Sequence, residues 1–582
     1  MFLRTAAIII LGFIAYASML PAPFRMMDDR LTIVDNPAIQ STKNISFIFQ
    51  KGYFNDHSYY RPLIDFSFMM EYRIFGLNSF YYNLDNLILH ILNALLVIML
   101  VSKLTNKETI GFWTGLLFVI HPLQWEAVCN VQGRAILLGA LFVLSSFILF
   151  LEYYKYRHQL SLILVMSTFF LGLLCKESVA VLPLVLVAFL SMDKSKPWNQ
   201  KIKFLWPFFV GIIGYIVLRQ YLGLTDDKQI GQSRDVIIYF ITFLRSVITD
   251  LRLIILPIDL HFDRSLALFT SLYQPQALFT CLIWFFILII FLFSYRKIHA
   301  FSLFLVLWFC IELIPISQLV ASIVVGKGRI STAEHFLYLA SIPIFIGMVT
   351  VYRWILIQGI IKKPILKFLA GGFLVFLLLT AVEQSIYSSN EFNMITRSLN
   401  FEPMNPRLQG VLGLLYASKN DIPDAQEHFR AAIKLEPNNP IYHIQLGTAL
   451  CQQGQWIEGL EQLVAFDPGK EKTMVKAQEV LTMAHLKQQL NEGKSFDARG
   501  WLAMGIYDAQ NGLRSQAIEA FQKTVSLNPA QADAWFNLGS LYEAGQDWSN
   551  ARTAYNKLLV LDNLTTFQKD FAQQHLIIMK DR

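Results

Sequence analysis

The sequence predicts an all-α protein, in which a polytopic transmembrane helical bundle of about eleven spans is followed by a tetratricopeptide-repeat α-solenoid. Three observations predict this class. The chain of 582 residues is 54% hydrophobic and only 16% charged, whereas soluble proteins carry about 25% charged residues. Long apolar runs recur through residues 1–384, and a regular repeat fills residues 400–582, which leaves 385–399 as the expected linker.

The first two-thirds of the chain contains apolar runs suited to crossing about 30 Å of hydrocarbon. The first run resembles a signal peptide, but we interpret it as an uncleaved span, because further spans follow and the next loop needs an anchor. The runs lie near residues 5–20, 84–102, 110–121, 135–152, 160–174, 178–192, 204–221, 276–294, 301–317, 335–352 and 365–383.

Lysine and arginine in the short loops between these runs indicate the orientation of the bundle. The positive-inside rule assigns such loops to the cytoplasm. The apolar stretch 236–256 contains Arg245, Asp250 and Arg252, which would be costly in lipid, so we expect it to lie outside the bilayer core. The N-terminus is then cytoplasmic and the repeats are extracytoplasmic. The short loops favour a bacterial inner membrane, with an endomembrane as the alternative.

Charge and cysteine content argue against two other classes of protein. The net charge of +7 comes largely from the loops between apolar runs, and no basic cluster with interleaved aromatic residues indicates a nucleic-acid partner. The five cysteines are scattered along the chain, so they predict neither a disulfide framework nor a zinc site.

The C-terminal third repeats with a period of 34 residues, because Trp501 recurs as Trp535 and Gly505 as Gly539. This is the tetratricopeptide pattern. The small residue lets two helices approach closely, and neighbouring hairpins bury one another's apolar faces. The packing residues do not specify what the repeats bind.

The first polar cluster is the pair Asp28–Asp29, which follows the first span. Two adjacent carboxylates at a membrane surface can supply a general base or ligands for a divalent metal. The alternative is a helix cap or a solvated loop. The pair alone does not decide whether a metal is needed, and no other cofactor is predicted.

Four further clusters fall on the same predicted outer side. Arg61 stands beside Tyr60 and suits phosphate capture, because its planar guanidinium binds phosphate oxygens bidentately; the alternative is pairing with lipid headgroups. A short turn after the third run carries proton-transfer and phosphate-binding groups, with helix capping and interfacial anchoring as the alternative. This turn contains His121, Glu126 and Arg134.

The last two clusters are short. Lys176 and Glu177 join two runs with almost no loop, and they could instead pair with each other or snorkel to the interface. Glu334 and His335 head the tenth run, where a glutamate is also an ordinary helix cap. Scattered structural polar residues would not be expected to gather on one side of a membrane.

The chain resembles the transmembrane and tetratricopeptide-repeat family of protein O-mannosyltransferases, and its bacterial relatives, in six motifs that occur in order. These are the acidic pair followed by IVDNP, then YYRPLIDFSF, FGLNSFYYNLDNLILHILNALLV, HPLQWEAVCNVQGR, LCKESVAVLPL and AEHFLYLAS, with the repeats after them. The resemblance covers nearly the whole chain. That family is similar in architecture to the GT-C membrane glycosyltransferases, which take sugar from a polyprenyl phosphate on the side away from the cytoplasm.

The resemblance implies that Asp28 or Asp29 is the catalytic acidic residue. His335 departs from the pattern, because relatives often have arginine there. The other residues that the resemblance places in the site lining are Arg61, His121, Glu126, Arg134, Lys176, Glu177 and Glu334.

The function that follows from the resemblance is transfer of a monosaccharide, with mannose as the candidate, from a polyprenyl-phosphate carrier to a protein hydroxyl. The expected partners are that lipid-linked sugar, membrane lipid and an acceptor polypeptide bound by the repeats. Two alternatives stay open at this point: a non-catalytic repeat scaffold for envelope or surface-polymer assembly, and a glycan ligase or polymerase.

Overall fold

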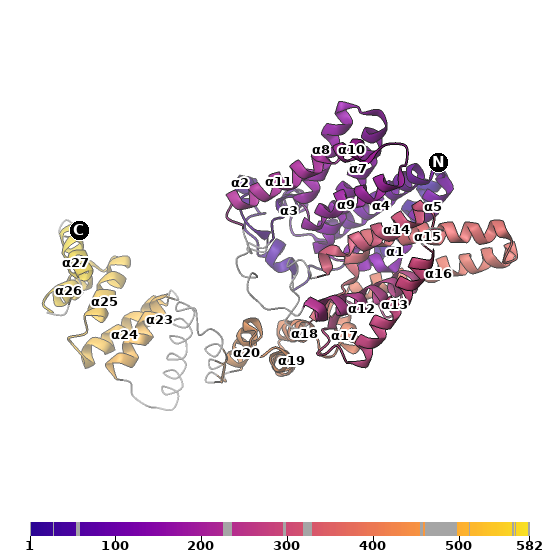
Figure 1. Cartoon of the computed structure of the whole chain (residues 1–582). Coiled ribbons are helices and arrows are strands. Elements are labelled where there is room, and N and C mark those ends of the chain that lie inside the picture. Colours follow the sequence, from indigo (N-terminus) through magenta and orange to yellow (C-terminus); the bar gives the residue numbers. More distant parts are fainter. Residues whose placement is uncertain are drawn as a thin grey trace. The chain divides into compact units, whose positions relative to one another are not determined.

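The computed structural model describes residues 2–462 except 27, 54–58, 225–235, 295–297, 318–328, 454, 456–457 and 460–461, and residues 497–579 except 511–512, 562–563 and 565. The chain divides into two compact units, Met1–Pro403 and Met404–Arg582, and each is described by itself. Both are helical (Figure 1), and the described strands are β1 (Ser265–Ala267) and β2 (Arg329–Ser331) of the first unit.

Each apolar run of the sequence coincides with a helix of the first unit. These helices are α1 (Phe2–Tyr16), α4 (Ser79–Thr105), α5 (Glu108–Ile120), α7 (Arg134–Tyr156), α8 (Gln159–Leu173), α9 (Leu182–Met192), α11 (Trp206–Tyr221), α13 (Pro275–Ser294), α14 (Ala300–Glu312), α15 (Leu337–Gln358) and α16 (Lys363–Ser388).

The described helices are not equally suited to crossing a bilayer. Six helical stretches are long and apolar enough, a bent pair at 44° would make a seventh, and four shorter apolar helices have 10–17 residues. On α13 the apolar side chains of Leu278, Phe279 and Phe293 are exposed, as expected of a lipid-facing helix. The first unit is therefore an integral membrane domain, and the count of eleven spans stays a prediction.

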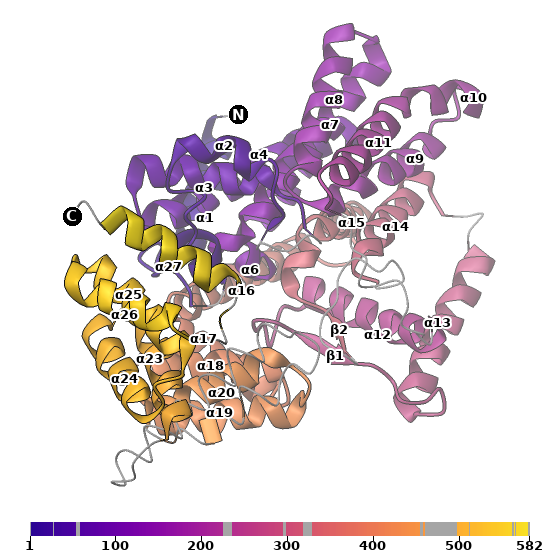
Figure 2. The same ribbon diagram turned by 90° about the vertical axis from the view of Figure 1, so that its left-hand side faces the viewer.

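The charged stretch 236–256 forms α12 (Val236–Ile255), which is not among the described helices that qualify as spans. It packs on α13, α15 and β1, and Figure 2 shows the two short strands beside it. Strands β1 and β2 pair antiparallel, with Leu266 opposite Ile330.

The segments that connect the apolar helices on the predicted outer side contain further short helices. They are η2 (Arg30–Val34), η3 (Thr42–Asn44), α2 (Ile45–Ile48), α3 (Pro62–Phe75), η5 (Pro122–Gln124), α6 (Trp125–Val128), η6 (Val131–Gly133), η7 (Glu177–Val181), η9 (Ile314–Ile316) and η10 (Glu334–Phe336). The turn before α7 requires glycine, because a Cβ at Gly133 would lie 1.9 Å from the carbonyl oxygen of Ala127.

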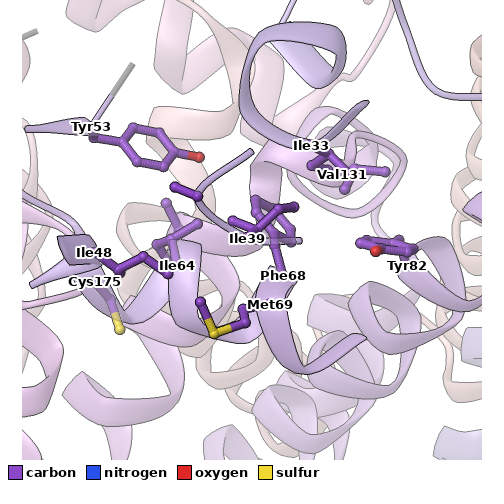
Figure 3. Packing of buried hydrophobic residues seen from close by; sticks show 12 residues of the cluster. Ile33, Ile39, Ile48, Tyr53, Ile64, Phe68, Met69, Tyr82, Val131 and Cys175 are labelled. Atoms are coloured by element: carbon purple, nitrogen blue, oxygen red, sulfur yellow. The ribbon is translucent and has the colours of Figure 1, made fainter. Parts of the chain in front are cut away.

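A buried hydrophobic cluster joins these outer segments (Figure 3). Ile33 and Tyr53 of the first outer loop pack there with Phe68 of α3, Val131 of η6 and Cys175 beside η7. Removing these apolar side chains from water holds together segments that are far apart in sequence. The cluster therefore brings the first outer loop beside the turns that carry the third and fourth polar clusters.

Residues 385–399, expected to be a linker, are helical and belong to the first unit. They comprise the end of α16 and most of α17 (Glu391–Phe401). Met394 and Ile395 of α17 are buried, and Ser398 accepts a hydrogen bond from the backbone N–H of Phe262 at 3.0 Å. The apolar positions of α17 thus pack on the outer loop that precedes β1.

The second unit consists of helical hairpins. Its described helices are α18 (Pro406–Ser418), α19 (Ile422–Leu435), α20 (Pro440–Gln452), α23 (Ala498–Gln510), α24 (Arg514–Leu527), α25 (Ala532–Ala544), α26 (Trp548–Leu559) and α27 (Thr566–Ile578).

The glycines of the 34-residue period lie where paired helices meet. A Cβ at Gly413 would lie 2.5 Å from the ring of Phe429, and one at Gly539 would lie 2.4 Å from the ring of Tyr555. Both aromatic rings are buried, so the small and large positions of each repeat interlock as the pattern predicts.

Candidate active site

The acidic pair lies just before η2, beside a small cavity. Asp29 is only 1% exposed, and its two carboxylate oxygens accept hydrogen bonds from the backbone N–H of Arg25 at 2.9 Å and from Nε2 of Gln132 at 3.1 Å. Asp28 is partly exposed. Both carboxylates line the cavity together with Arg25, Asn130, Phe262, Glu391 and Met394.

Burial raises the pKa of Asp29 to about 6, although the hydrogen bonds from Arg25 and Gln132 and the charge of Arg25 act in the opposite direction. A general base is most effective when its pKa lies near the working pH. The carboxylate of Asp29 therefore has the acidity that proton transfer near neutrality needs.

Gln132 and Tyr53 connect the acidic pair to Arg61. The hydroxyl of Tyr53 donates to Oε1 of Gln132 at 2.6 Å. The guanidinium carbon of Arg61 lies 5.7 Å from the ring centre of Tyr53 and 4.8 Å from that of Tyr59. Arg61 therefore lies close to the residues that hold Asp29.

Sequence reasoning did not single out Gln132 or Tyr53. Gln132 lies inside the turn 121–134 that was recognised as polar. However, nothing in a single sequence marks a neutral amide as a partner of a carboxylate that precedes it by 103 positions.

Arg61 forms an ion pair with Glu177, in which Nη2 lies 2.9 Å from Oε2 and Nε lies 3.2 Å from the same oxygen. Burial opposes the charge on Arg61, but Glu177 and the two tyrosines raise the pKa of Arg61 above its ordinary value. The guanidinium therefore stays charged, held over two aromatic rings.

Lys176 faces a cavity of about 60 Å³ with largely apolar walls. Within the part of the chain that the structure describes, its ammonium group makes no hydrogen bond or ion pair, and it lies 5.5 Å from the ring centre of Phe336. Burial, followed by the charge of Arg61, lowers the pKa of Lys176 to about 7. The apolar walls come from α7, α9, η9 and α15, Lys176 and His335 contribute the basic groups, and Glu312 at the end of α14 contributes a carboxyl group.

Glu126 and His335 meet beside this cavity. Nδ1 of His335 lies 3.0 Å from one oxygen of Glu126, and the backbone N–H of His335 donates to the other at 3.0 Å. Burial opposes ionisation of Glu126, but His335 more than offsets it, so the pKa of Glu126 lies below its ordinary value. Glu126 therefore holds the histidine at the cavity wall.

Glu334 is fully buried on the other side of this turn. Its carboxylate accepts hydrogen bonds from Nε1 of Trp125 at 2.6 Å, from the backbone N–H of His261 at 3.1 Å and from Nη2 of Arg264 at 3.2 Å. These contacts tie the head of α15 to the outer loop before β1.

Arg134 and His121 have interior partners. Nη2 of Arg134 pairs with Glu71 at 2.7 Å and its Nε donates to Oδ1 of Asn86 at 2.6 Å. Nδ1 of His121 accepts from the backbone N–H of Leu123 at 3.2 Å. The His121 contact is an N-cap of η5, as in the capping interpretation that the sequence left open for this turn, whereas the Arg134 contacts join α7 to α3 and α4.

A metal ion would have few protein ligands in this pocket. Within the described residues, no three histidine, cysteine, aspartate or glutamate side chains come together in a way that could hold a metal. The acidic pair supplies at most two carboxylates, so a metal ion there would have to take its other ligands from substrate or water.

Comparison with known protein families identifies repeats in the second unit. Two family models match the second unit, one described as "Tetratricopeptide repeat" at residues 502–564 and one described as "TPR repeat" at residues 413–454. They confirm that the 34-residue period is a tetratricopeptide array.

The curated relatives are named protein O-mannosyl-transferases. F38B6.6 of Caenorhabditis elegans is 25% identical over 460 residues, covering 74% of this chain and 62% of the relative. TMTC1 of Mus musculus is 34% identical over 130 residues, covering 21% and 14%, and TMTC2 of Homo sapiens is 32% identical over 157 residues, covering 25% and 18%. The chain thus matches 62% or less of the length of each of these proteins. The family resemblance seen in the motifs is confirmed: this membrane protein with tetratricopeptide repeats is a relative of the TMTC-family protein O-mannosyl-transferases.

Proposed function

We propose that the protein is a membrane glycosyltransferase that moves a monosaccharide, with mannose as the candidate, from a polyprenyl-phosphate carrier to a protein hydroxyl. One observation carries the proposal. Asp29, the buried member of the acidic pair, is linked through Gln132 and Tyr53 to Arg61, and Lys176, which has no ion-pair or hydrogen-bond partner among the described residues, faces a largely apolar cavity.

The donor fits the Lys176 side of this arrangement. A polyprenyl-phosphate sugar combines an anionic phosphate with a long hydrocarbon chain, so its site must offer a cation next to apolar walls at a membrane surface. Lys176 and the apolar side chains of α7 and α15 meet that requirement. Arg61, whose charge acts on Lys176, adds a second positive charge between Lys176 and the acidic pair.

The acceptor fits the acidic side. Asp28 or Asp29 takes the proton of the acceptor hydroxyl as its oxygen forms a bond to the anomeric carbon. The bond from that carbon to the phosphate oxygen breaks, its electron pair stays on the lipid phosphate, and the configuration inverts. Lys176 and Arg61 stabilise the charge that develops on the leaving phosphate.

The repeats hold the acceptor polypeptide along a face of the solenoid, as helical repeats commonly do. In this proposal the N-terminus is cytoplasmic and the pocket and repeats are extracytoplasmic, in a bacterial inner membrane. Proteins made in the cytoplasm would reach the pocket as they leave the membrane.

The test is sugar transfer by the full chain in liposomes that contain polyprenyl-phosphate mannose, with glycosylated acceptor detected by mass spectrometry. Asp28→Asn with Asp29→Asn is expected to abolish transfer, and Lys176→Met to reduce it by about 100-fold, the scale of losing one stabiliser of developing charge. Lys362→Met, at an exposed lysine before α16, is the matched control and should leave transfer unchanged.

The alternatives predict different outcomes. A repeat scaffold would show no transfer, and its cellular role would survive the double aspartate change. A glycan ligase or polymerase would transfer sugar to glycan and not to polypeptide. Undiminished protein glycosylation by the double aspartate variant would remove the proposed base.

A further inference from the structure

Gln132 is held rigidly by its own turn. It occupies η6, where its backbone N–H donates to Oδ1 of Asn130 at 3.1 Å. Gly133 follows in close contact with the carbonyl oxygen of Ala127. The main chain therefore has little freedom, and the side chain of Gln132 is directed to one place.

Both ends of the Gln132 side chain are engaged. Its amide nitrogen donates to Oδ1 of Asp29 at 3.1 Å and also contacts Oγ1 of Thr32, while its amide oxygen accepts from the hydroxyl of Tyr53 at 2.6 Å. An amide has one donor end and one acceptor end, and an ionised carboxylate only accepts. The carboxylate of Asp29 thus selects the N–H end of the amide, and the Tyr53 hydroxyl, by donating to the amide oxygen, holds the other end in place. Figure 3 shows the Tyr53 hydroxyl pointing toward the side of the cluster where Ile33 and Val131 lie.

We propose that Gln132 is a positioning residue for the acidic pair: its amide fixes the orientation of the Asp29 carboxylate and favours its ionised form, and Tyr53 keeps the amide turned the right way. The inference rests on the proposed function, in which this pair supplies the base. Gln132 thus acts on the base although its side chain is neutral. The loop that carries Tyr53 helps to hold the base in position.

Other charged groups also face Asp29 and set the background for this effect. Arg25 contributes its backbone N–H and its positive charge, and Asp28 contributes a neighbouring negative charge. Glu391 of α17 lines the same cavity. None of these charged groups is altered when Gln132 is replaced. A substitution at position 132 therefore tests the contribution of the amide to the pKa of Asp29.

The test is an infrared titration of the Asp29 carboxyl band, identified by its loss in Asp29→Asn, with the full chain in detergent. Gln132→Met keeps the length of the side chain and removes the donor. The midpoint of the titration is expected to rise by about one pH unit, because a hydrogen bond to a charged group is typically worth that much. Gln132→Glu, which places a second carboxylate against the first, should raise it further. Tyr53→Phe, which frees the amide, should raise it less.

Sugar transfer provides the second measurement. If Asp29 must be ionised, the acidic limb of the pH–rate profile should move upward by the same amount, giving about fivefold lower transfer near pH 6 and recovery near pH 8. Gln50→Met is the matched control, since Gln50 is an exposed glutamine of the same loop whose side-chain amide donates only to Ser46 among the described residues. Gln50→Met should change neither the titration midpoint of the Asp29 carboxyl band nor the acidic limb of the pH–rate profile.

The outcomes separate the two proposals. An Asp29 midpoint that is the same in wild type, Gln132→Met and Gln132→Glu overturns the role of Gln132, whether or not sugar is transferred. A midpoint that moves as expected in a wild-type chain that transfers no sugar supports the positioning by Gln132 and counts against the glycosyltransferase. If Gln132→Met does not fold, Tyr53→Phe decides the question, because it leaves the turn of η6 unchanged.

Discussion

Nη2 of Arg134 lies 2.7 Å from Oε1 of Glu71, and both side chains are almost fully buried. The pair joins the start of α7 to α3, and Arg134 also donates to Asn86 and to the carbonyl oxygen of Tyr82. Burial raises the pKa of Glu71 to about 8, with Arg134 acting in the opposite direction. This relationship makes Arg134 a structural residue of the turn, and it leads to the first prediction.

Arg134→Met should destabilise the protein in a pH-dependent way. Removing one partner of a buried ion pair typically costs about 3–5 kcal/mol, and this full loss is expected near pH 9, where Glu71 is ionised and paired in the wild type but must either take up a proton or stay an unpaired anion in the variant. Near pH 6 Glu71 is protonated and neutral, so the loss should be smaller. Thermal unfolding in detergent at both pH values measures the difference.

The exposed pair Arg30–Asp35, with an Nε–Oδ2 distance of 3.1 Å, provides the control for that measurement. Arg30→Met should cost less than about 1 kcal/mol at either pH, as is usual for surface ion pairs. Equal destabilisation of Arg134→Met at both pH values would show that Glu71 does not take up a proton in the folded state.

The charge of Lys176 should determine how donor binding weakens as the pH becomes alkaline. Its pKa of about 7 means that it is charged below that pH and neutral above it, so the KM for the polyprenyl-phosphate donor should rise as pH increases from about 7 to about 9. Lys176→Arg keeps a positive charge throughout this range, so its KM should be nearly independent of pH. Steady-state kinetics in liposomes decide the matter, and parallel rises in both proteins would contradict the assignment.

The repeat packing makes Gly539 sensitive to a single methyl group. In Gly539→Ala the new Cβ would lie 2.4 Å from the ring of Tyr555, and overpacking of this kind typically costs about 1–3 kcal/mol. Hydrogen exchange should quicken in α25 and α26 while α18 and α19 keep their protection. Gly371→Ala is the control, because a Cβ there has no heavy atom within 4 Å, and it should leave exchange unchanged.

The orientation of the first unit can be tested by fusion of alkaline phosphatase, which needs the oxidising extracytoplasmic side to form its disulfides. Fusion after Pro403 should give active enzyme, and fusion at Lys362, in a basic loop predicted to be cytoplasmic, should give inactive enzyme. Activity in the opposite pattern would place the repeats inside and would separate them from an extracytoplasmic pocket.

The helices of this protein were largely predictable, because apolar composition and length decide whether a segment enters lipid. Segment 276–294 is an example, because its composition predicts a membrane span and the segment forms α13. The expected linker at 385–399 was harder to interpret. Its polar residues suggest a connection, but Met394, Ile395 and Ser398 are buried, and Ser398 accepts a hydrogen bond from the loop before β1. Only the presence of that loop makes the segment a packed helix.

The residues of the candidate site were also only partly predictable from the sequence. Asp28, Arg61 and Lys176 could be selected from the sequence as charged residues on one predicted side of a membrane. Arg134 and His121 satisfied the same criterion, yet their partners lie in the interior. A charged side chain binds substrate only when its neighbours leave it accessible, and neighbours distant in sequence are not visible in a single chain.

The sequence by itself determined the class of each segment, the 34-residue packing period and the choice of chemical groups, because these depend on local composition and spacing. Only the tertiary structure decided which charges are paired and which face a cavity. Folding places Gln132 between Asp29 and Tyr53, and it leaves Lys176 without an ion-pair or hydrogen-bond partner in the described part of the chain. The physical reason is that burial and hydrogen bonding depend on distances in space, and these are set by the packing of the whole bundle.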